Sequence, residues 1–145
     1  DTSSQAQVAN LLVDLVHEFK MGMVFISHDL SIVRRISDRV AVMYLGKIVE
    51  IGTTSQIWEN PSHPYTRALV SAIPHADGAS FMPSDLPGDV PNPMNPPSGC
   101  RFHPRCQLAL PKCTTEEPQF VTLTDNREVS CFLQREGESP ASITL

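Results

Sequence analysis

The sequence predicts an α/β fold followed by an irregular extension that is rich in proline and cysteine. None of the 13 prolines precedes Pro61, and all but Pro140 lie within residues 61–118. Because proline interrupts helices and strands, we expect regular structure mainly before Pro61. Within that part, helical, strand-like and again helical periodicity follow one another over residues 4–37, an order typical of a mostly parallel sheet.

Residues 4–20 are predicted to form an amphipathic helix, because their apolar side chains recur at spacings of three and four. The side chains of this stripe are Val8, Leu11, Leu12, Leu15, Val16 and Phe19. Residues 23–27 form a short apolar run that predicts a buried strand. Ser27 or Asp29 can then cap a second helix over roughly residues 29–37.

Residues 39–51 predict a β-hairpin. Two β-favouring runs in this range flank Gly46-Lys47, a pair that suits a two-residue turn. Thr53 or Thr54 can cap a short helix directly after the second run.

The last regular element that the pattern predicts is a helix that Pro64 opens and that ends near Ala72. Beyond it we expect a proline-rich linker, a segment that holds all four cysteines, and a tail. The predicted parts of the chain are residues 1–73, 74–98, 99–133 and 134–145.

Charge and hydropathy argue against two classes of partner. The net charge of -5 and the pI near 5.4 provide no basic field, so we expect no nucleic-acid partner. The sequence contains no apolar run near the ~20 residues that a spanning helix needs, and no signal-peptide pattern, so we expect a cytoplasmic protein.

Because the chain begins at Asp1 and one parallel-type strand needs neighbours, we expect the C-terminal piece of a longer protein.

His28 is the candidate catalytic residue. It follows the predicted strand directly, and ligands of open α/β sheets bind beyond the carboxyl ends of strands. An imidazole at that place can donate a hydrogen bond to a phosphate oxygen. The alternative is a histidine that only packs or caps the next helix.

The four cysteines are candidate metal ligands. Their spacing is Cys100-x5-Cys106-x6-Cys113-x17-Cys131. Disulfides are disfavoured in the cytoplasm, and four thiolates suit tetrahedral zinc or an iron–sulfur cluster. The absence of a closely spaced pair favours the cluster, whereas four reduced structural cysteines remain the alternative. His103 could replace one of these ligands, but we favour a role as a neighbour of the thiolates.

Several segments resemble the nucleotide-binding subunits of ATP-binding cassette (ABC) transporters. Asp1 and the helix after it look like the D-loop, and Phe25-Ile26-Ser27-His28-Asp29-Leu30 looks like the switch-histidine loop. Two longer segments are similar to the oligopeptide and dipeptide importer subfamily, and a third looks like the strand after the switch loop. These segments are residues 60–69, 95–106 and 38–46. Gln107 stands where members of the subfamily usually carry proline.

The resemblance implies the C-terminal part of an ABC-type P-loop ATPase domain, with the cysteine segment as an appendix. His28 would contact the γ-phosphate of ATP, and Asp1 would act across the interface of two ATPase subunits that sandwich ATP and Mg²⁺. The transmembrane permease subunits would be the further partners, at the cytoplasmic face of the membrane. Cys100, Cys106, Cys113 and Cys131 would carry a 4Fe–4S cluster.

The phosphate-binding loop, the signature motif and the catalytic glutamate of that family are absent from these residues, so this chain alone should not hydrolyse ATP. The rival function, from a different class, is a non-enzymatic, cysteine-rich metal-binding interaction module. A phosphate-binding loop encoded upstream in the same frame would separate the two, because only the transporter function requires it.

Overall fold

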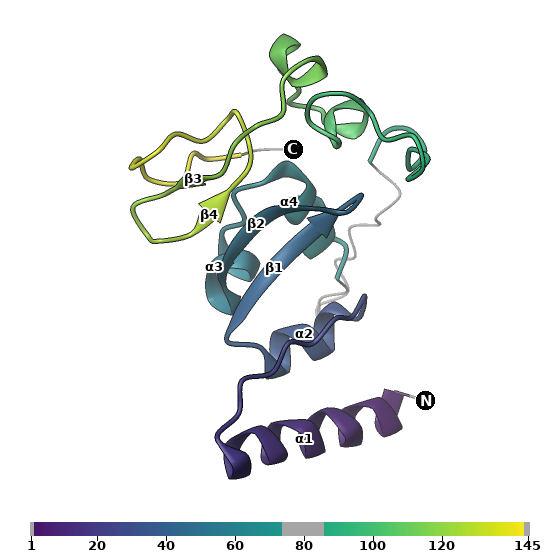
Figure 1. The fold of residues 1–145 in the computed structure, drawn as a ribbon, viewed down its shortest axis with the longest axis vertical. Helices are drawn as coiled ribbons and strands as arrows, with labels where there is room; N and C mark the ends of the chain where they lie inside the picture. The colour runs from purple at the N-terminus through teal and green to yellow at the C-terminus, as the bar shows by residue number, and fades with distance from the viewer. Residues whose placement is uncertain (1, 74–85, 144–145) are drawn as a thin grey trace. The chain divides into compact units, whose positions relative to one another are not determined.

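The computed structural model describes residues 2–73 and 86–143 of the chain, which divides into two compact units, residues 1–38 and 39–145. The first unit is helical, and the second contains a sheet with flanking helices and turns (Figure 1). The fold is therefore mixed α/β, as the sequence predicts. In the part of the chain that is described, no helix is both long and apolar enough to cross a membrane.

The first unit consists of the helices α1 (Thr2–Phe19) and α2 (Leu30–Ile36), both close to their predicted ranges. Asp29 caps α2: its Oδ1 accepts hydrogen bonds from the backbone N–H groups of Ser31 and Ile32, at 2.9 and 3.2 Å. An acidic N-cap satisfies donors that have no partner within the helix, which explains why the helix begins here. The predicted cap is confirmed.

The predicted buried strand over residues 23–27 is wrong. These residues form no helix or strand, and the side chains of Val24 and Ile26 are 91% and 93% exposed. A strand forms only when a neighbouring strand satisfies its backbone groups. Residues 2–38 contain no other strand that could do so. A short apolar run such as residues 23–27 has the composition of a strand, but it cannot supply the neighbouring strand with which its backbone would form hydrogen bonds.

The second unit is built on an antiparallel hairpin of β1 (Arg39–Tyr44) and β2 (Lys47–Thr53). The turn is Leu45-Gly46, with φ of 45° and 76°, and both values lie in the left-handed region that two-residue hairpin turns use. The predicted hairpin is confirmed, although its turn lies one residue earlier than predicted.

Two short strands extend this sheet: β3 (Val121–Thr122) and β4 (Glu128–Val129). The strand order is β1-β2-β4-β3, and every described pairing is antiparallel. The mostly parallel sheet expected from the helix-strand-helix pattern of residues 4–37 does not form among the described residues, because residues 23–27 are not a strand. Since β4 pairs with β2, the chain returns to the hairpin within the cysteine segment, just before Cys131 (Figure 1).

Two helices pack beside the hairpin, α3 (Thr54–Glu59) and α4 (Pro64–Ser71). Thr53 and Gln56 form a reciprocal capping box at α3, and Pro64 occupies the first turn of α4. Both helices therefore begin where the sequence places them, because their signals are local.

The buried core of the second unit contains side chains from the hairpin, from α3 and from the cysteine segment. Its members are Val42, Tyr44, Val49, Ile57 and Phe102. The ring of Phe102 is 1% exposed and packs edge-on against Tyr44, with centroids 5.2 Å apart. Residues after the cysteines are packed as well, because Gln134 and Ile143 are buried. The proline-rich residues 86–98 contain turns and bends but no helix or strand.

Candidate functional site

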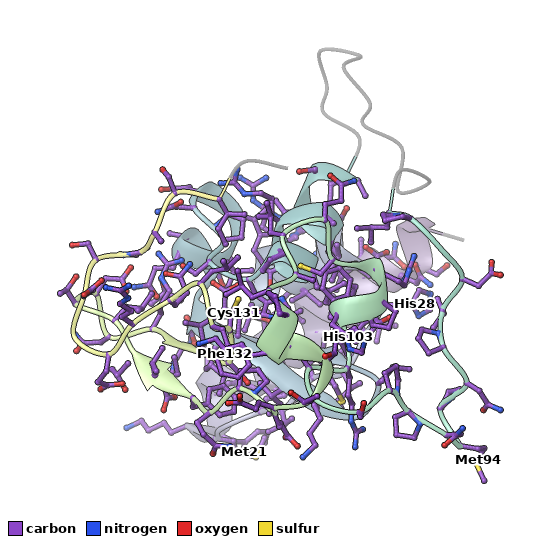
Figure 2. The ribbon with its side chains drawn as sticks, turned by 90° about the horizontal axis from the view of Figure 1, so that it is seen from above. Met21, His28, Met94, His103, Cys131 and Phe132 are labelled. Carbon is purple, nitrogen blue, oxygen red and sulfur yellow. The ribbon has the colours of Figure 1, made fainter. Side chains whose placement is uncertain are left out.

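The four cysteines, which are free thiols, line one small cavity of the second unit. The remaining lining is mostly apolar and includes the rings of Phe102 and Phe132. Figure 2 shows Cys131 and Phe132, together with His103, which also lines the cavity. The structure thus brings together all four cysteines that the sequence predicts as ligands. They lie within a segment of 32 residues, counted from the first cysteine to the last.

Backbone hydrogen bonds and one glycine hold the cysteine loops together. The N–H of Cys100 donates to the carbonyl of Cys113 at 2.9 Å. Gly99 has a φ of +66°, and a Cβ built on it would lie 2.4 Å from the same carbonyl oxygen. Only glycine permits both the left-handed backbone and this close approach. Cys131 is placed by the sheet, since the N–H of Ser130 donates to the carbonyl of Val49.

Burial dominates the electrostatics of the thiols. It raises the pKa of Cys100 and of Cys106, and it raises the pKa of Cys131 to about 12. The neighbouring cysteines add to each rise, because several thiolates in one cavity repel one another. Without a cation, the thiols of Cys100, Cys106 and Cys131 stay protonated at neutral pH. A bound metal would supply the positive charge that reverses this preference.

The donor set suits a thiophilic metal or an iron–sulfur cluster, because four sulfur atoms are the ligands that such groups prefer. In residues 2–73 and 86–143, however, no three His, Cys, Asp or Glu side chains are arranged as a ready metal-binding group. The four thiols therefore line one cavity as free cysteines, and they are not placed as the ligands of a bound metal would be. The fit lies in the chemistry of the four donors and in their common, largely apolar surroundings.

Two histidines line the same cavity and have opposite proton arrangements. Nδ1 of His63 accepts a hydrogen bond from the backbone N–H of Tyr65 at 3.1 Å. Nδ1 of His103 lies 2.9 Å from the carbonyl oxygen of Cys100, and a carbonyl can only accept. A neutral His103 therefore carries its proton on Nδ1 and a lone pair on Nε2.

A buried ion pair between Glu50 and Arg127 lies next to the backbone of His63. Oε1 of Glu50 accepts from the N–H of Ser62 at 2.8 Å, and Oε2 accepts from the N–H of His63 at 2.9 Å. Arg127 Nη1 lies 3.4 Å from Glu50 Oε1, and both side chains are almost fully buried. Burial raises the pKa of Glu50, while the two N–H donors and Arg127 oppose the rise.

Arg127 also anchors the last third of the chain. Its guanidinium donates to Asp125 Oδ2 at 2.7 Å, to Ser62 Oγ at 2.9 Å and to the carbonyl of Asn60. Gln134 Nε2 adds a bond to the carbonyl of Ser62 at 3.0 Å. Apart from the bond to Asp125, these contacts join residues 65–72 positions apart in sequence. The sequence analysis missed Glu50, Arg127 and His63, and the only local signal was a charge within the apolar β2 run.

His28 lies in the first unit, is exposed, and directly precedes the cap of α2. Figure 2 shows its side chain. Asp1 lies outside the described residues. The nucleotide contacts expected of these two residues stay predictions, as do the cysteine ligands.

Residues 49–113 match the family model described as oligopeptide/dipeptide transporter, C-terminal region. The chain is 50% identical over 135 residues to the probable peptide ABC transporter ATP-binding protein y4tS of Sinorhizobium fredii. That match covers 92% of this chain and 38% of the relative. The dipeptide transport ATP-binding protein DppF of Haemophilus influenzae is 49% identical over 91% of the chain and 41% of its own length.

The oligopeptide transport ATP-binding protein AppF of Bacillus subtilis is 46% identical, over 92% of the chain and 41% of the relative. The chain thus spans about two fifths of the length of these curated relatives. The resemblance drawn from the sequence motifs is confirmed. Residues 49–113 are thus similar to the C-terminal region of oligopeptide/dipeptide transporters, and nine tenths of the chain are similar to ATP-binding proteins of peptide ABC transporters.

Proposed function

We propose that this chain is the C-terminal part of an ATP-hydrolysing subunit that powers peptide import through an ABC transporter. The observation that carries the proposal is the sequence identity of 46–50%, over nine tenths of the chain, to three ATP-binding proteins of peptide transporters. The match of residues 49–113 to the family model of the transporters' C-terminal region also supports it. In this proposal the remaining three fifths of the subunit supply the phosphate-binding loop and the general base.

Within that subunit, residues 1–73 would complete the ATPase domain and residues 74–98 would link it to the cysteine segment 99–133, with residues 134–145 as a tail. The antiparallel hairpin with its two capped helices supports a compact end to such a domain. The exposed apolar residues of 20–28 support it too, because an ATPase sheet would cover them.

His28 would donate a hydrogen bond to the γ-phosphate and so position it and signal its presence, whereas the proton acceptor for water lies elsewhere in the subunit. Charge on the phosphate oxygens grows during phosphoryl transfer, so a donor at that place stabilises the transition state. The exposure of His28 beside the Asp29 cap supports this role, because its ring is accessible. Asp1 would contact a second ATPase subunit and couple the two nucleotide sites. ATP and Mg²⁺ are then the cofactors of the complete dimer.

The partners of this proposal are the second ATPase subunit and the membrane-embedded permease subunits, which would place the protein at the cytoplasmic face of the membrane. Closure of the ATPase dimer on ATP would drive the permease between its conformations. Nucleic acid is no partner in this proposal, because the chain carries a net charge of -5.

The four cysteines would hold a 4Fe–4S cluster, with zinc as the alternative. The group would cross-link a segment that has few apolar residues and would thereby stabilise it. The shared cavity and the four sulfur donors support the proposal. Anaerobic purification should give brown protein with iron and sulfide in about equal amounts. Zinc without iron in the purified protein would refute the cluster and retain a four-thiolate site.

A cysteine-rich interaction module without enzymatic activity is the second candidate, and the shared thiol cavity is the observation that favours it. Transport by the complete complex separates the two functions. The complex, reconstituted in vesicles with its membrane partners, should accumulate peptide only when ATP is hydrolysed. Metal binding without any ATP turnover by the complete protein would contradict the transporter proposal and favour the module.

A further inference from the structure

The turn that contains the last cysteine forms part of the wall of the thiol cavity. Phe132 and Leu133 line the cavity together with Cys131. The N–H of Gln134 donates to the carbonyl of Cys131 at 3.1 Å and so closes the turn. The N–H of Leu133 donates to the sulfur of Cys131. Residues 131–134, the wall turn, therefore hold one thiol and two apolar lining residues in one piece of backbone.

The side chain of Gln134 fastens the wall turn to the rest of the second unit. It is 5% exposed, and its Nε2 donates to the carbonyl of Ser62 at 3.0 Å. Its Oε1 accepts from the N–H of Ala141 at 2.9 Å. Ser62 is itself fixed, because its N–H donates to Oε1 of Glu50 at 2.8 Å. One amide thus joins the wall turn both to the segment before α4 and to the end of the chain.

The other end of the wall turn is fixed to the sheet. The N–H of Ser130 donates to the carbonyl of Val49 at 2.9 Å, and its Oγ donates to the carbonyl of Pro118 at 2.7 Å. If Gln134 were released, the turn would stay hinged at Ser130. The two ends of the turn therefore differ, because one is held by the sheet and the other by a single side chain.

Residues 134–143 form a strap that runs beside β3, and we call it the C-terminal strap. The N–H of Gly137 donates to the carbonyl of Thr122 at 2.8 Å. The N–H of Thr124 donates to the carbonyl of Glu138 at 3.1 Å. The strap is thus attached to the sheet mainly through backbone hydrogen bonds.

The C-terminal strap is buried at its two ends. Gln134 and Ile143 are 5% and 3% exposed, whereas residues 135–139 and 141–142 are exposed. Segments with few buried apolar contacts and with exposed hydrogen bonds open at a lower free energy than the core of a domain. The strap has both properties, so it can detach while the hairpin and its helices stay folded.

We propose that the C-terminal strap is a latch on the thiol cavity. When the strap detaches, Gln134 leaves the carbonyl of Ser62, and the wall turn swings about Ser130. The cysteines then become accessible to a thiophilic metal ion or to a soft electrophile. When the strap is closed, the wall turn excludes both. The latch controls access to the thiols whatever group they hold.

The urea dependence of alkylation tests the latch in the wild-type protein. The complete ATP-binding subunit, prepared free of metal, is treated with iodoacetamide at urea concentrations below its unfolding transition, and peptide mass spectrometry follows Cys131. A local opening exposes little surface, so the rate should rise only weakly with urea, as should hydrogen exchange at Gly137 and Ala141. A rate that rises as steeply as hydrogen exchange in β2 would overturn the latch, because the thiol would then react only after global unfolding.

The variant Gln134→Ala tests the fastening directly, because it removes both side-chain hydrogen bonds. Alkylation of Cys131 should become about tenfold faster, as expected for the loss of buried hydrogen bonds. Arg135→Ala is the matched control, since this neighbouring side chain is 79% exposed, and its rate should equal that of the wild type. Equal rates in Gln134→Ala and the wild type would overturn the latch. If Gln134→Ala does not fold, the urea dependence of the wild type decides.

Discussion

Replacing Gly99 with alanine should destabilise the second unit far more than the same change at Gly137. Both glycines have a left-handed backbone, with φ of +66° and +69°. A Cβ at Gly99 would lie 2.4 Å from the carbonyl oxygen of Cys113 and 2.9 Å from two backbone atoms of the next residues. A Cβ at Gly137 would meet no atom within 4 Å. The pair therefore separates the steric clash from the cost of the backbone conformation.

The left-handed conformation costs an alanine about 1–2 kcal/mol at either position. At Gly99, relief of the overlap needs a backbone shift, for which overpacking costs of about 1–3 kcal/mol are typical. The shift would also weaken the bond from Cys100 to Cys113, worth about 1 kcal/mol. Gly99→Ala should thus exceed Gly137→Ala by about 2–4 kcal/mol in the free energy of unfolding.

Urea unfolding measures this difference through the fluorescence of Trp58, the single tryptophan, which packs against the core of the second unit. At about 4–8 °C per kcal/mol for a domain of 60–100 residues, the melting temperatures should differ by at least about 8 °C. Equal stabilities of the two variants would refute the close approach of Gly99 to the carbonyl of Cys113.

Two further predictions concern the buried groups of the second unit. Arg127→Met should lower the free energy of unfolding by about 3–5 kcal/mol, because it leaves the carboxylate of Glu50 buried without its cation. Arg135→Met, at a side chain 79% exposed, should leave it nearly unchanged, and equal urea midpoints would contradict the buried pair. In the metal-free chain, Cys131 should react with iodoacetamide about a thousandfold more slowly at pH 8 than in urea, because its pKa rises from 9.0 to about 12. Since the folded thiol binds its proton more tightly, this contribution to stability is complete below pH 9 and is lost as the pH rises towards 12. Fast native alkylation of Cys131, measured by peptide mass spectrometry, would contradict the raised pKa of this thiol.

The elements that local chemistry defines were predictable from the sequence. The hairpin follows from β-favouring runs around Gly46, and α3 and α4 begin at Thr54 and Pro64 because their caps and first-turn residues are adjacent. The run over residues 23–27 shows the limit of such patterns. Its composition suits a strand, but a strand also needs partners, and residues 2–38 supply none.

The second unit also contains contacts that no local pattern encodes. Glu50 and Arg127 are 77 residues apart, and nothing near either one indicates the other. Likewise, the position of His63 at the thiol cavity depends on how the cysteine segment folds back against α4. The cysteines did indicate that they share a site, because four thiol donors seldom occur by chance within one short segment.

Turnover of ATP by the complete subunit with His28→Ala tests the proposed function most directly. The account predicts a strong loss of hydrolysis with nucleotide binding largely retained, since the imidazole acts on the γ-phosphate during transfer. His17→Ala, which changes an exposed histidine of α1 in the same unit, should hydrolyse ATP at the wild-type rate. Near-normal turnover by His28→Ala would contradict the account.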